Sequence, residues 1–119
     1  MFNKISIIGC GLIGSSILRA VVEKKLASKI SAYDKASKVT DYLKKNFSVE
    51  ICSNISDVVK NSDLVIIASP LSSYKEIILS IQSNLKENVI LTDTGSAKKE
   101  VNKIINNFIY FFFYRTCIG

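Results

Sequence analysis

A G-x-G-x-x-G motif stands directly behind a short apolar run near the start of this 119-residue chain. The run, residues 4–8 (KISII), is β-branched and apolar, which is typical of a strand buried on both faces of a parallel sheet. After the glycines the pattern changes to helical spacing over residues 12–25. The apolar residues expected on the inner face of this helix are Ile13, Ile17, Ala20 and Val21. The chain is therefore constrained to begin with a strand that turns tightly into a helix.

Strand and helix patterns alternate along the rest of the chain. Further strands are expected at residues 29–33, 49–52, 63–68, 88–92 and 108–113. Helices are expected at residues 36–46, after Asn54 as N-cap, after Ser73, and around Ala97, Val101, Ile104 and Ile105. Residues 73–76 match a capping box, and the helix behind it has one apolar face formed by Ile77, Ile78, Ile81 and Leu85. This alternation predicts an α/β fold, a doubly wound parallel sheet of the Rossmann type with about six strands.

Composition limits the kinds of function. The net charge is +6, but the lysines are scattered without interleaved aromatics, so we expect no nucleic-acid partner. No apolar run approaches the roughly 20 residues of a membrane helix, so we expect no membrane partner. The 3 cysteines are odd in number and form no CxxC pair, which argues against a disulfide framework or a metal site and fits a cytoplasmic setting. The chain contains 0 histidines and therefore supplies no imidazole base.

The glycine motif has a functional and a structural interpretation. In the functional one, Gly9 permits the tight turn, Gly11 lets a pyrophosphate approach the backbone, and Gly14 lets the helix pack closely against the sheet. The start of the helix supplies N–H groups to the anion. The other residues of this predicted cofactor-binding loop are Cys10, Leu12 and Ile13. We interpret Cys10 as a small filler rather than a reactive thiol. The structural alternative is an ordinary buried turn in a small core.

Asp34 ends the second expected strand, 20 residues beyond Gly14. A carboxylate at this place accepts the ribose hydroxyls of NAD and repels the extra 2′-phosphate of NADP. The alternative is a helix N-cap or a turn aspartate. Lys35 and Lys38 weaken the exclusion of NADP, because either cation could offset a 2′-phosphate. We therefore predict NAD as the cofactor, with NADP possible.

Two further segments follow strands at the edge where ligands of open α/β sheets lie. Ser69 and Pro70 follow the fourth strand and are predicted to line the cofactor, or else to form a simple strand-to-helix turn. Residues 92–98 (TDTGSAK) follow the fifth strand and place a hydroxyl, a carboxylate and an ammonium there. As structure alone, Ser96 is an N-cap and Asp93 a turn residue.

The segments IIGCGLIGSS, YDK, ASPL and TDTGSAK together resemble the N-terminal, nucleotide-binding domain of prephenate/arogenate dehydrogenases, also called cyclohexadienyl dehydrogenases. The resemblance extends over residues 4–107. Its specific part is T-D-x-G-S-x-K, because many dehydrogenases share the glycine motif. The resemblance implies NAD(P)-dependent oxidative decarboxylation of prephenate or arogenate in tyrosine biosynthesis, with a hydride passing to the nicotinamide as carbon dioxide leaves. It also implies that Ser96 is catalytic beside the nicotinamide, that Asp93 belongs to the cofactor-binding residues, and that Asp93 and Lys98 support the site.

The match ends at residues 111–113 (FFF). The family continues with a His-Pro segment, whose histidine takes the substrate proton, and with a helical domain that binds substrate and forms a homodimer. We therefore expect residues 1–113 to be a dinucleotide-binding domain, residues 114–119 to be an aberrant or truncated tail, and the chain alone to be inactive. Our hypothesis is a frame slip in the Phe codons; a gene without a downstream frame encoding the missing domain would contradict it.

Two other functions remain open at this point. A stand-alone NAD-binding regulatory or redox-sensing module would use the same glycines and Asp34, but it would not need Ser96 and Lys98 beside the nicotinamide. A β-hydroxyacid-type dehydrogenase could use the same sheet. The segment after the fifth strand argues against it.

Overall fold

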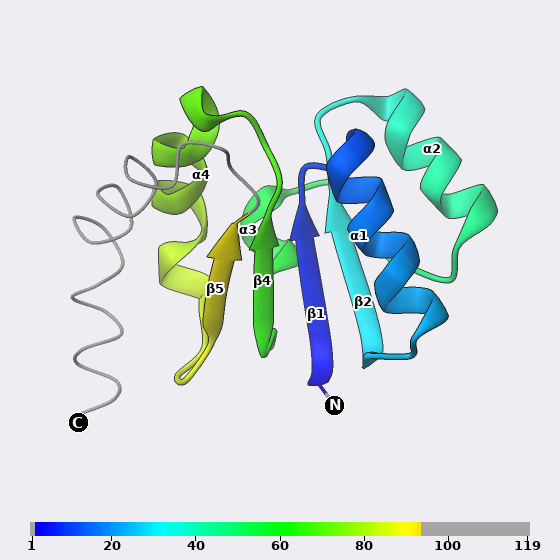
Figure 1. Ribbon diagram of the computed structural model, residues 1–119. Helices are drawn as coiled ribbons and strands as arrows, with labels where there is room; N and C mark the ends of the chain where they lie inside the picture. Colours follow the sequence, from blue (N-terminus) through cyan, green and yellow to red (C-terminus); the bar gives the residue numbers. More distant parts are fainter. Residues whose placement is uncertain (1, 94–119) are drawn as a thin grey trace.

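The computed structural model describes residues 2–93 and contains a single parallel sheet (Figure 1). Its strands are β1 (Phe2–Ile8), β2 (Ala27–Tyr33), β3 (Glu50–Ile51), β4 (Leu64–Ile67) and β5 (Ile90–Asp93). They lie in the order β3-β2-β1-β4-β5, and every pair is parallel. The reversal of order beside β1 is the mark of a doubly wound sheet, so the predicted fold is confirmed. The sixth strand expected at 108–113 and the helix expected around 97–105 lie outside the described residues.

Helices cover both faces of this sheet. They are α1 (Leu12–Glu23), α2 (Ser37–Asn46), α3 (Ile55–Val58) and α4 (Tyr74–Ile81), with short 3₁₀ turns at Leu71–Ser73 and Gln82–Asn84. Figure 1 shows α1 in front of the sheet and α3 behind it. None of the helices within residues 2–93 is long and apolar enough to cross a membrane.

Two separate apolar clusters show why the central strands are apolar at nearly every position. In β1, Ile5 and Ile7 pack with Leu18 of α1 and Leu43 of α2. The next side chain along, Ile8, points the other way into the cluster formed with α3 and α4. Because successive side chains of a strand point to opposite faces, burial on both faces favours apolar residues at most positions. The buried hydroxyl of Ser6 is accommodated by hydrogen bonds with the carbonyl of Val58 and the hydroxyl of Ser62.

The inner face of α1 differs from the prediction. Ile13 is 59% exposed and Ala20 is exposed, whereas Leu18 and Val21 are buried. The prediction is right for Val21 and for Ile17, which packs against the core cluster, and it is wrong for Ile13 and Ala20. Gly14 is buried on the inner side, and Leu18 lies one helical turn further along the same face.

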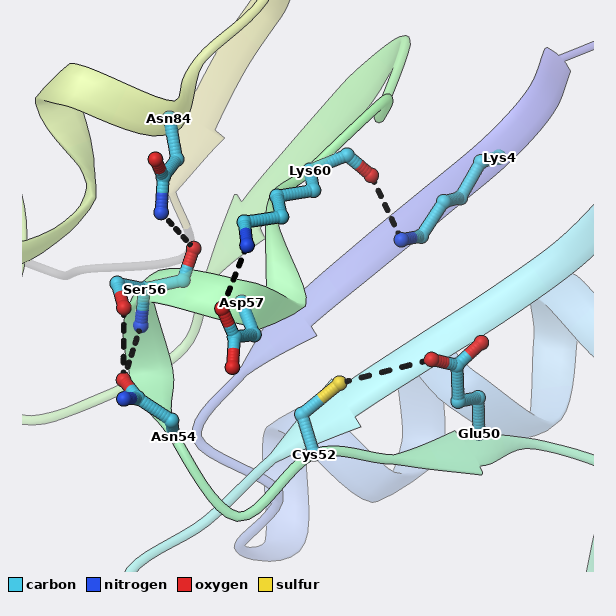
Figure 2. Close-up of polar contacts among 8 residues, drawn as sticks. All are labelled: Lys4, Glu50, Cys52, Asn54, Ser56, Asp57, Lys60 and Asn84. Carbon is cyan, nitrogen blue, oxygen red and sulfur yellow. Dashed lines mark hydrogen bonds and ion pairs between the residues drawn. The ribbon is translucent and has the colours of Figure 1, made fainter.

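The two predicted helix N-caps have different outcomes. The side chain of Asn54 accepts a hydrogen bond from the N–H of Ser56 at 2.9 Å, so the N-cap of α3 is confirmed (Figure 2). The capping box at Ser73 is wrong, because Ser73 makes no side-chain cap hydrogen bond. Its backbone is already helical, with φ −95° and ψ −8°, since the preceding 3₁₀ turn leads directly into α4. An N-cap residue needs an extended backbone to reach back to the N–H groups.

Polar contacts fix the opposite edge of the sheet, where the strands begin. The carboxylate of Asp63 accepts hydrogen bonds from the backbone N–H groups of Asn3 at 2.6 Å and Lys4 at 3.3 Å, and it pairs with the ammonium of Lys86. The Lys4 ammonium in turn donates to the carbonyl of Lys60 at 2.7 Å (Figure 2). These bonds join the starts of β1 and β4 and the turn that precedes β5.

Candidate functional site

The candidate site lies at the carboxyl ends of the strands and begins with Gly9, directly after β1. Gly9 has φ +87°, in the left-handed region that favours glycine. A Cβ atom here would lie 2.9 Å from the backbone nitrogen of Ser69, closer than real Cβ contacts come. The N–H of Gly9 donates to the carbonyl of Tyr33 at 2.8 Å. Gly9 therefore turns the chain tightly between the ends of β2 and β4.

Gly14 and Gly11 differ in what surrounds them. A Cβ on Gly14 would collide with the carbonyl group of Gly9, so this glycine is required for α1 to pack against the turn. A Cβ on Gly11 would meet nothing within 4 Å. Packing within the protein therefore explains Gly9 and Gly14 but not Gly11. An open position with bare backbone beside a helix N-terminus is suited to the close approach of a phosphate.

The start of α1 has its own unused donors. Gly11 is the N-cap residue, with an extended backbone, and no side chain within residues 2–93 caps the helix. The first N–H groups of a helix have no partner inside it, and the helix dipole places positive charge at the same end. This terminus is therefore suited to an anion.

Cys10 lies beneath the turn rather than in the open space. It is 1% exposed, and burial raises the pKa of its thiol to about 12, with the charge of Asp34 adding to the effect. The thiol is protonated at neutral pH and is a poor nucleophile. This is consistent with the interpretation of Cys10 as a small filler.

Asp34 joins the turn to the end of β2. Its Oδ2 accepts the backbone N–H of Cys10 at 2.7 Å, and its Oδ1 accepts the N–H of Ala36 at 2.8 Å. The second bond is the turn role that the sequence offers as the alternative to ribose binding. Each carboxylate oxygen has a further lone pair, so the turn role leaves acceptor capacity toward the cavity.

A cavity of about 870 Å³ opens over these residues. The predicted site residues that line it are Gly9, Gly11, Ile13, Asp34, Ser69 and Pro70. Its volume falls within the range of small-molecule and cofactor sites, roughly 300–1,000 Å³. Ile13 is an exposed residue of α1, and it places an apolar side chain at the cavity wall. Cavity, open glycine and helix N-terminus together fit the phosphates and flat rings of a dinucleotide.

The other predicted residues are less closely tied to the cavity. Cys10 and Gly14 shape the turn from below, and Leu12 is the first residue of α1. Asp93 ends β5, in register with Ile67 of β4, at the same edge of the sheet as Gly9. Ser96 and Lys98 lie outside the described residues, so their roles stay predictions.

Several residues that line the cavity were not predicted from the sequence. The missed residues there are Tyr33, Ile55, Ser73, Glu76, Ile77 and Ser80. One signal was present in the sequence, because Glu76 and Ser80 are four residues apart and so share one face of α4. Their position over the cavity depends on how α4 packs, which a local pattern does not report.

Comparisons with known proteins agree with this geometry. Residues 4–96 match the family described as NADP oxidoreductase coenzyme F420-dependent. Over 108 residues the chain is 35% identical to the cyclohexadienyl dehydrogenase of Zymomonas mobilis, covering 90% of this chain and 37% of that protein. It is also 35% identical over 101 residues to the L-aspartate dehydrogenase of Methanocaldococcus jannaschii, covering 82% of this chain and 38% of that protein.

A solved structure shares the fold. It is the prephenate dehydrogenase of Aquifex aeolicus in complex with hydroxyphenyl propionate and NAD⁺, with a TM-score of 0.72 and 21% identity over 91% of this chain and 40% of that one. The chain thus spans well under half the length of these relatives. The resemblance to prephenate and cyclohexadienyl dehydrogenases is confirmed at the level of this domain, since the chain is also 31% identical over 105 residues to the prephenate dehydrogenase of Lactococcus lactis. By the match over residues 4–96, the chain belongs to the family described as NADP oxidoreductase coenzyme F420-dependent.

Proposed function

We propose that the cavity binds NAD, with NADP as a possible second cofactor, and that the chain is the cofactor-binding part of a dehydrogenase. The single observation that carries the proposal is the contrast at the glycine turn. Gly9 and Gly14 are required by contacts within the protein, whereas Gly11 faces open space at a helix start that no side chain within residues 2–93 caps. In the proposal, Gly9, Gly11 and the first N–H groups of α1 hold the pyrophosphate. When bound, the nicotinamide supplies a hydride acceptor.

Asp34 supports NAD as the preferred cofactor. Its carboxylate is fixed by two backbone N–H groups at the end of β2 and lines the cavity. A fixed negative charge accepts ribose hydroxyls and opposes a 2′-phosphate. Lys35 also lines the cavity, and its cation offsets part of that opposition.

For the reaction of the whole protein, we propose oxidative decarboxylation of prephenate or arogenate, a step in tyrosine biosynthesis. The support is the similarity to a cyclohexadienyl dehydrogenase together with the TDTGSAK segment. Ser96 is proposed to lie beside the nicotinamide and orient the reacting hydroxyl, with Asp93 and Lys98 nearby. The cyclohexadienyl substrate and a homodimer both require a helical domain like that of the family. Cysteine usage supports a cytoplasmic location.

L-aspartate is a second candidate substrate, because the similarity to an L-aspartate dehydrogenase reaches the same 35% identity. The two candidates differ in chemistry. Oxidation of an amino acid leaves its carboxylates in place, whereas oxidation of the cyclohexadienyl ring releases carbon dioxide. A stand-alone NAD-binding module would do neither and would only bind the dinucleotide.

Titration with NADH tests the cofactor proposal. The fluorescence of the reduced nicotinamide should rise on binding to the 119-residue chain, and excess NAD⁺ should compete. Gly11→Ala should weaken binding at least tenfold, because the new methyl group occupies the space proposed for phosphate. Its folding should change little, because that Cβ meets nothing within 4 Å. Thermal unfolding of both proteins provides the control. Equal NADH affinity in wild type and Gly11→Ala would contradict the proposed phosphate position.

The reaction is tested separately, on the complete product of the gene. NAD⁺ and NADP⁺ are each assayed with prephenate, arogenate and L-aspartate, following both reduced nicotinamide and carbon dioxide. Reduction with carbon dioxide release from a cyclohexadienyl substrate supports the proposal. Reduction with aspartate alone supports the second candidate. Ser96→Ala should abolish turnover while NADH binding remains; unchanged turnover would remove Ser96 from the proposed mechanism.

A further inference from the structure

One region of the cavity wall is formed by residues from the end of β2, from α3 and from α4. This region is lined by Tyr33, Ile55, Ile77, Glu76 and Ser80. The first three supply apolar surface, and the last two supply oxygen atoms. The region therefore combines apolar side chains with polar acceptors at one edge, on α4.

Specific bonds hold α3 and α4 beside each other. The side-chain nitrogen of Asn84, which follows α4, donates to the carbonyl of Ser56 in α3 at 2.6 Å (Figure 2). Asn54 caps the start of α3 through the N–H and hydroxyl of the same Ser56, at 2.9 and 2.8 Å. Ile55 is thus held in position against the cavity, facing the helix that bears Glu76.

Glu76 and Ser80 both act as acceptors. The Ser80 hydroxyl donates its hydrogen to the backbone carbonyl of Glu76 at 2.8 Å, which leaves only lone pairs on its oxygen. Among residues 2–93, the Glu76 carboxylate makes no hydrogen bond or ion pair. A ligand group that fits this edge must donate hydrogen bonds.

The order of groups in a dinucleotide decides which part reaches this region. If the pyrophosphate lies at Gly11 and its ribose at Asp34, the next group along is the adenine base. In the proposal the base lies against Tyr33 and Ile55, which line the same cavity as Asp34. Adenine has flat apolar faces and an exocyclic 6-amino group that donates two hydrogen bonds. Both features match the region.

We propose that Glu76 accepts a hydrogen bond from the 6-amino group of adenine and makes the cavity selective for adenine over a base with a 6-keto oxygen. This inference rests on the proposed binding of NAD. A keto oxygen at the same place would face the carboxylate with lone pairs on both sides. Glu76 is a specificity-determining residue in this proposal, while Ile55 and Ile77 bind any flat base.

A simpler role for Glu76 makes a different prediction. Glu76 lies in the first turn of α4, where a carboxylate stabilises the helix dipole. That role would make Glu76→Gln slightly less stable to heat. It would not make the protein distinguish two dinucleotides that differ only at one substituent of the base.

The test compares NADH with reduced nicotinamide hypoxanthine dinucleotide, in which a keto oxygen replaces the 6-amino group. Both are fluorescent, so both dissociation constants come from titration of the 119-residue chain without any turnover. We expect NADH to bind about tenfold more tightly, as for a hydrogen bond to a charged group at a partly exposed site. In Glu76→Gln the ratio should fall close to one, because an amide offers an acceptor to the amine and a donor to the keto oxygen. Glu23→Gln, at the far end of α1, is the matched control and should keep the wild-type ratio.

The failures of the two proposals are distinguishable. If both dinucleotides bind the wild type equally, the inference about Glu76 is wrong and the proposed cofactor stands. A wild-type ratio that survives in Glu76→Gln assigns the selectivity to another group and also overturns the inference. If neither dinucleotide binds a chain that unfolds cooperatively on heating, the proposed function fails and the inference fails with it.

Discussion

The backbone N–H of Cys10 donates to Oδ2 of Asp34 at 2.7 Å, across 24 residues of sequence. This bond ties the glycine turn after β1 to the end of β2. The other carboxylate oxygen accepts the N–H of Ala36 at 2.8 Å and shapes the chain that leads into α2. One side chain therefore bonds both the glycine turn and the segment that leads into α2, which gives Asp34 a structural role in addition to the proposed contact with ribose.

Removing this carboxylate should affect folding as well as binding. In Asp34→Ala, two backbone N–H groups lose a charged acceptor, and we expect a loss of about 1–2 kcal/mol in the free energy of unfolding. NADH binding should weaken by more than this loss explains, since the proposed ribose contact is lost at the same time. Urea unfolding followed by circular dichroism measures the first effect, and NADH titration of the folded protein measures the second. Asp41→Ala, an exposed position on α2, should change neither. Wild-type stability of Asp34→Ala would show that the bond to Cys10 contributes nothing.

Gly14 and Gly11 should respond differently to replacement by alanine. Gly14→Ala forces a methyl group against the carbonyl of Gly9, and overpacking of this kind costs about 1–3 kcal/mol or more. Gly11→Ala meets no atom within 4 Å, so its free energy of unfolding should change by less than about 1 kcal/mol, mainly through the poorer N-cap. Parallel urea titrations compare the two. Equal losses would mean that Gly14 does not pack against the turn as described.

The pKa of Cys10 predicts how stability depends on alkaline pH. Burial raises this pKa from 9.0 to about 12, so the folded state keeps the proton after the unfolded state begins to lose it. The contribution is therefore fully present below pH 9 and declines as the pH rises from 9 toward 12. Denaturant titrations at a series of pH values should show a smaller decline for Cys10→Ala than for the wild type. Identical alkaline profiles would contradict the burial of this thiol as a titrating group.

The order of strands and helices was predictable because it follows from the spacing of apolar residues along the chain. Apolar runs bounded by turn residues placed all five described strands, and Asn54 marked the start of α3 correctly. Which residues of α1 face the core was only partly predictable. Ile13, Ile17 and Leu18 are all apolar, yet Leu18 is buried, Ile17 is half-buried and Ile13 is exposed, an order that depends on how the helix packs against the sheet.

The errors and omissions have three different physical causes. At Ser73 the capping-box pattern is present, yet the helical turn that precedes it excludes the extended backbone of an N-cap. For Asp34, sequence reasoning weighed a turn role against a ligand role as alternatives, although one carboxylate has oxygens enough for both. Glu76 reaches the cavity only because α4 lies beside α3.

The last prediction concerns acid stability at the edge opposite the cavity. The pKa of Asp63 is lowered from its ordinary value of 3.8, mainly by the hydrogen bond from Lys86 and then by the backbone N–H groups of Asn3 and Lys4. Because the folded-state pKa is depressed, the stabilisation is fully present well above pH 3.8 and is lost as the pH falls through the lower folded value.

Asp63→Asn cannot ionise, so its melting temperature should be lower than that of the wild type near neutral pH. The difference should shrink as the pH falls below about 4, because the carboxylate is then protonated first in the unfolded state and, at lower pH, in the folded state as well. Melting curves between pH 2.5 and 7 measure this convergence. Asp57→Asn breaks an exposed pair with Lys60 at 2.9 Å and should have a much smaller effect, because exposed pairs contribute little. A constant difference between wild type and Asp63→Asn at every pH would show that Asp63 acts through its shape and hydrogen bonds rather than through its charge.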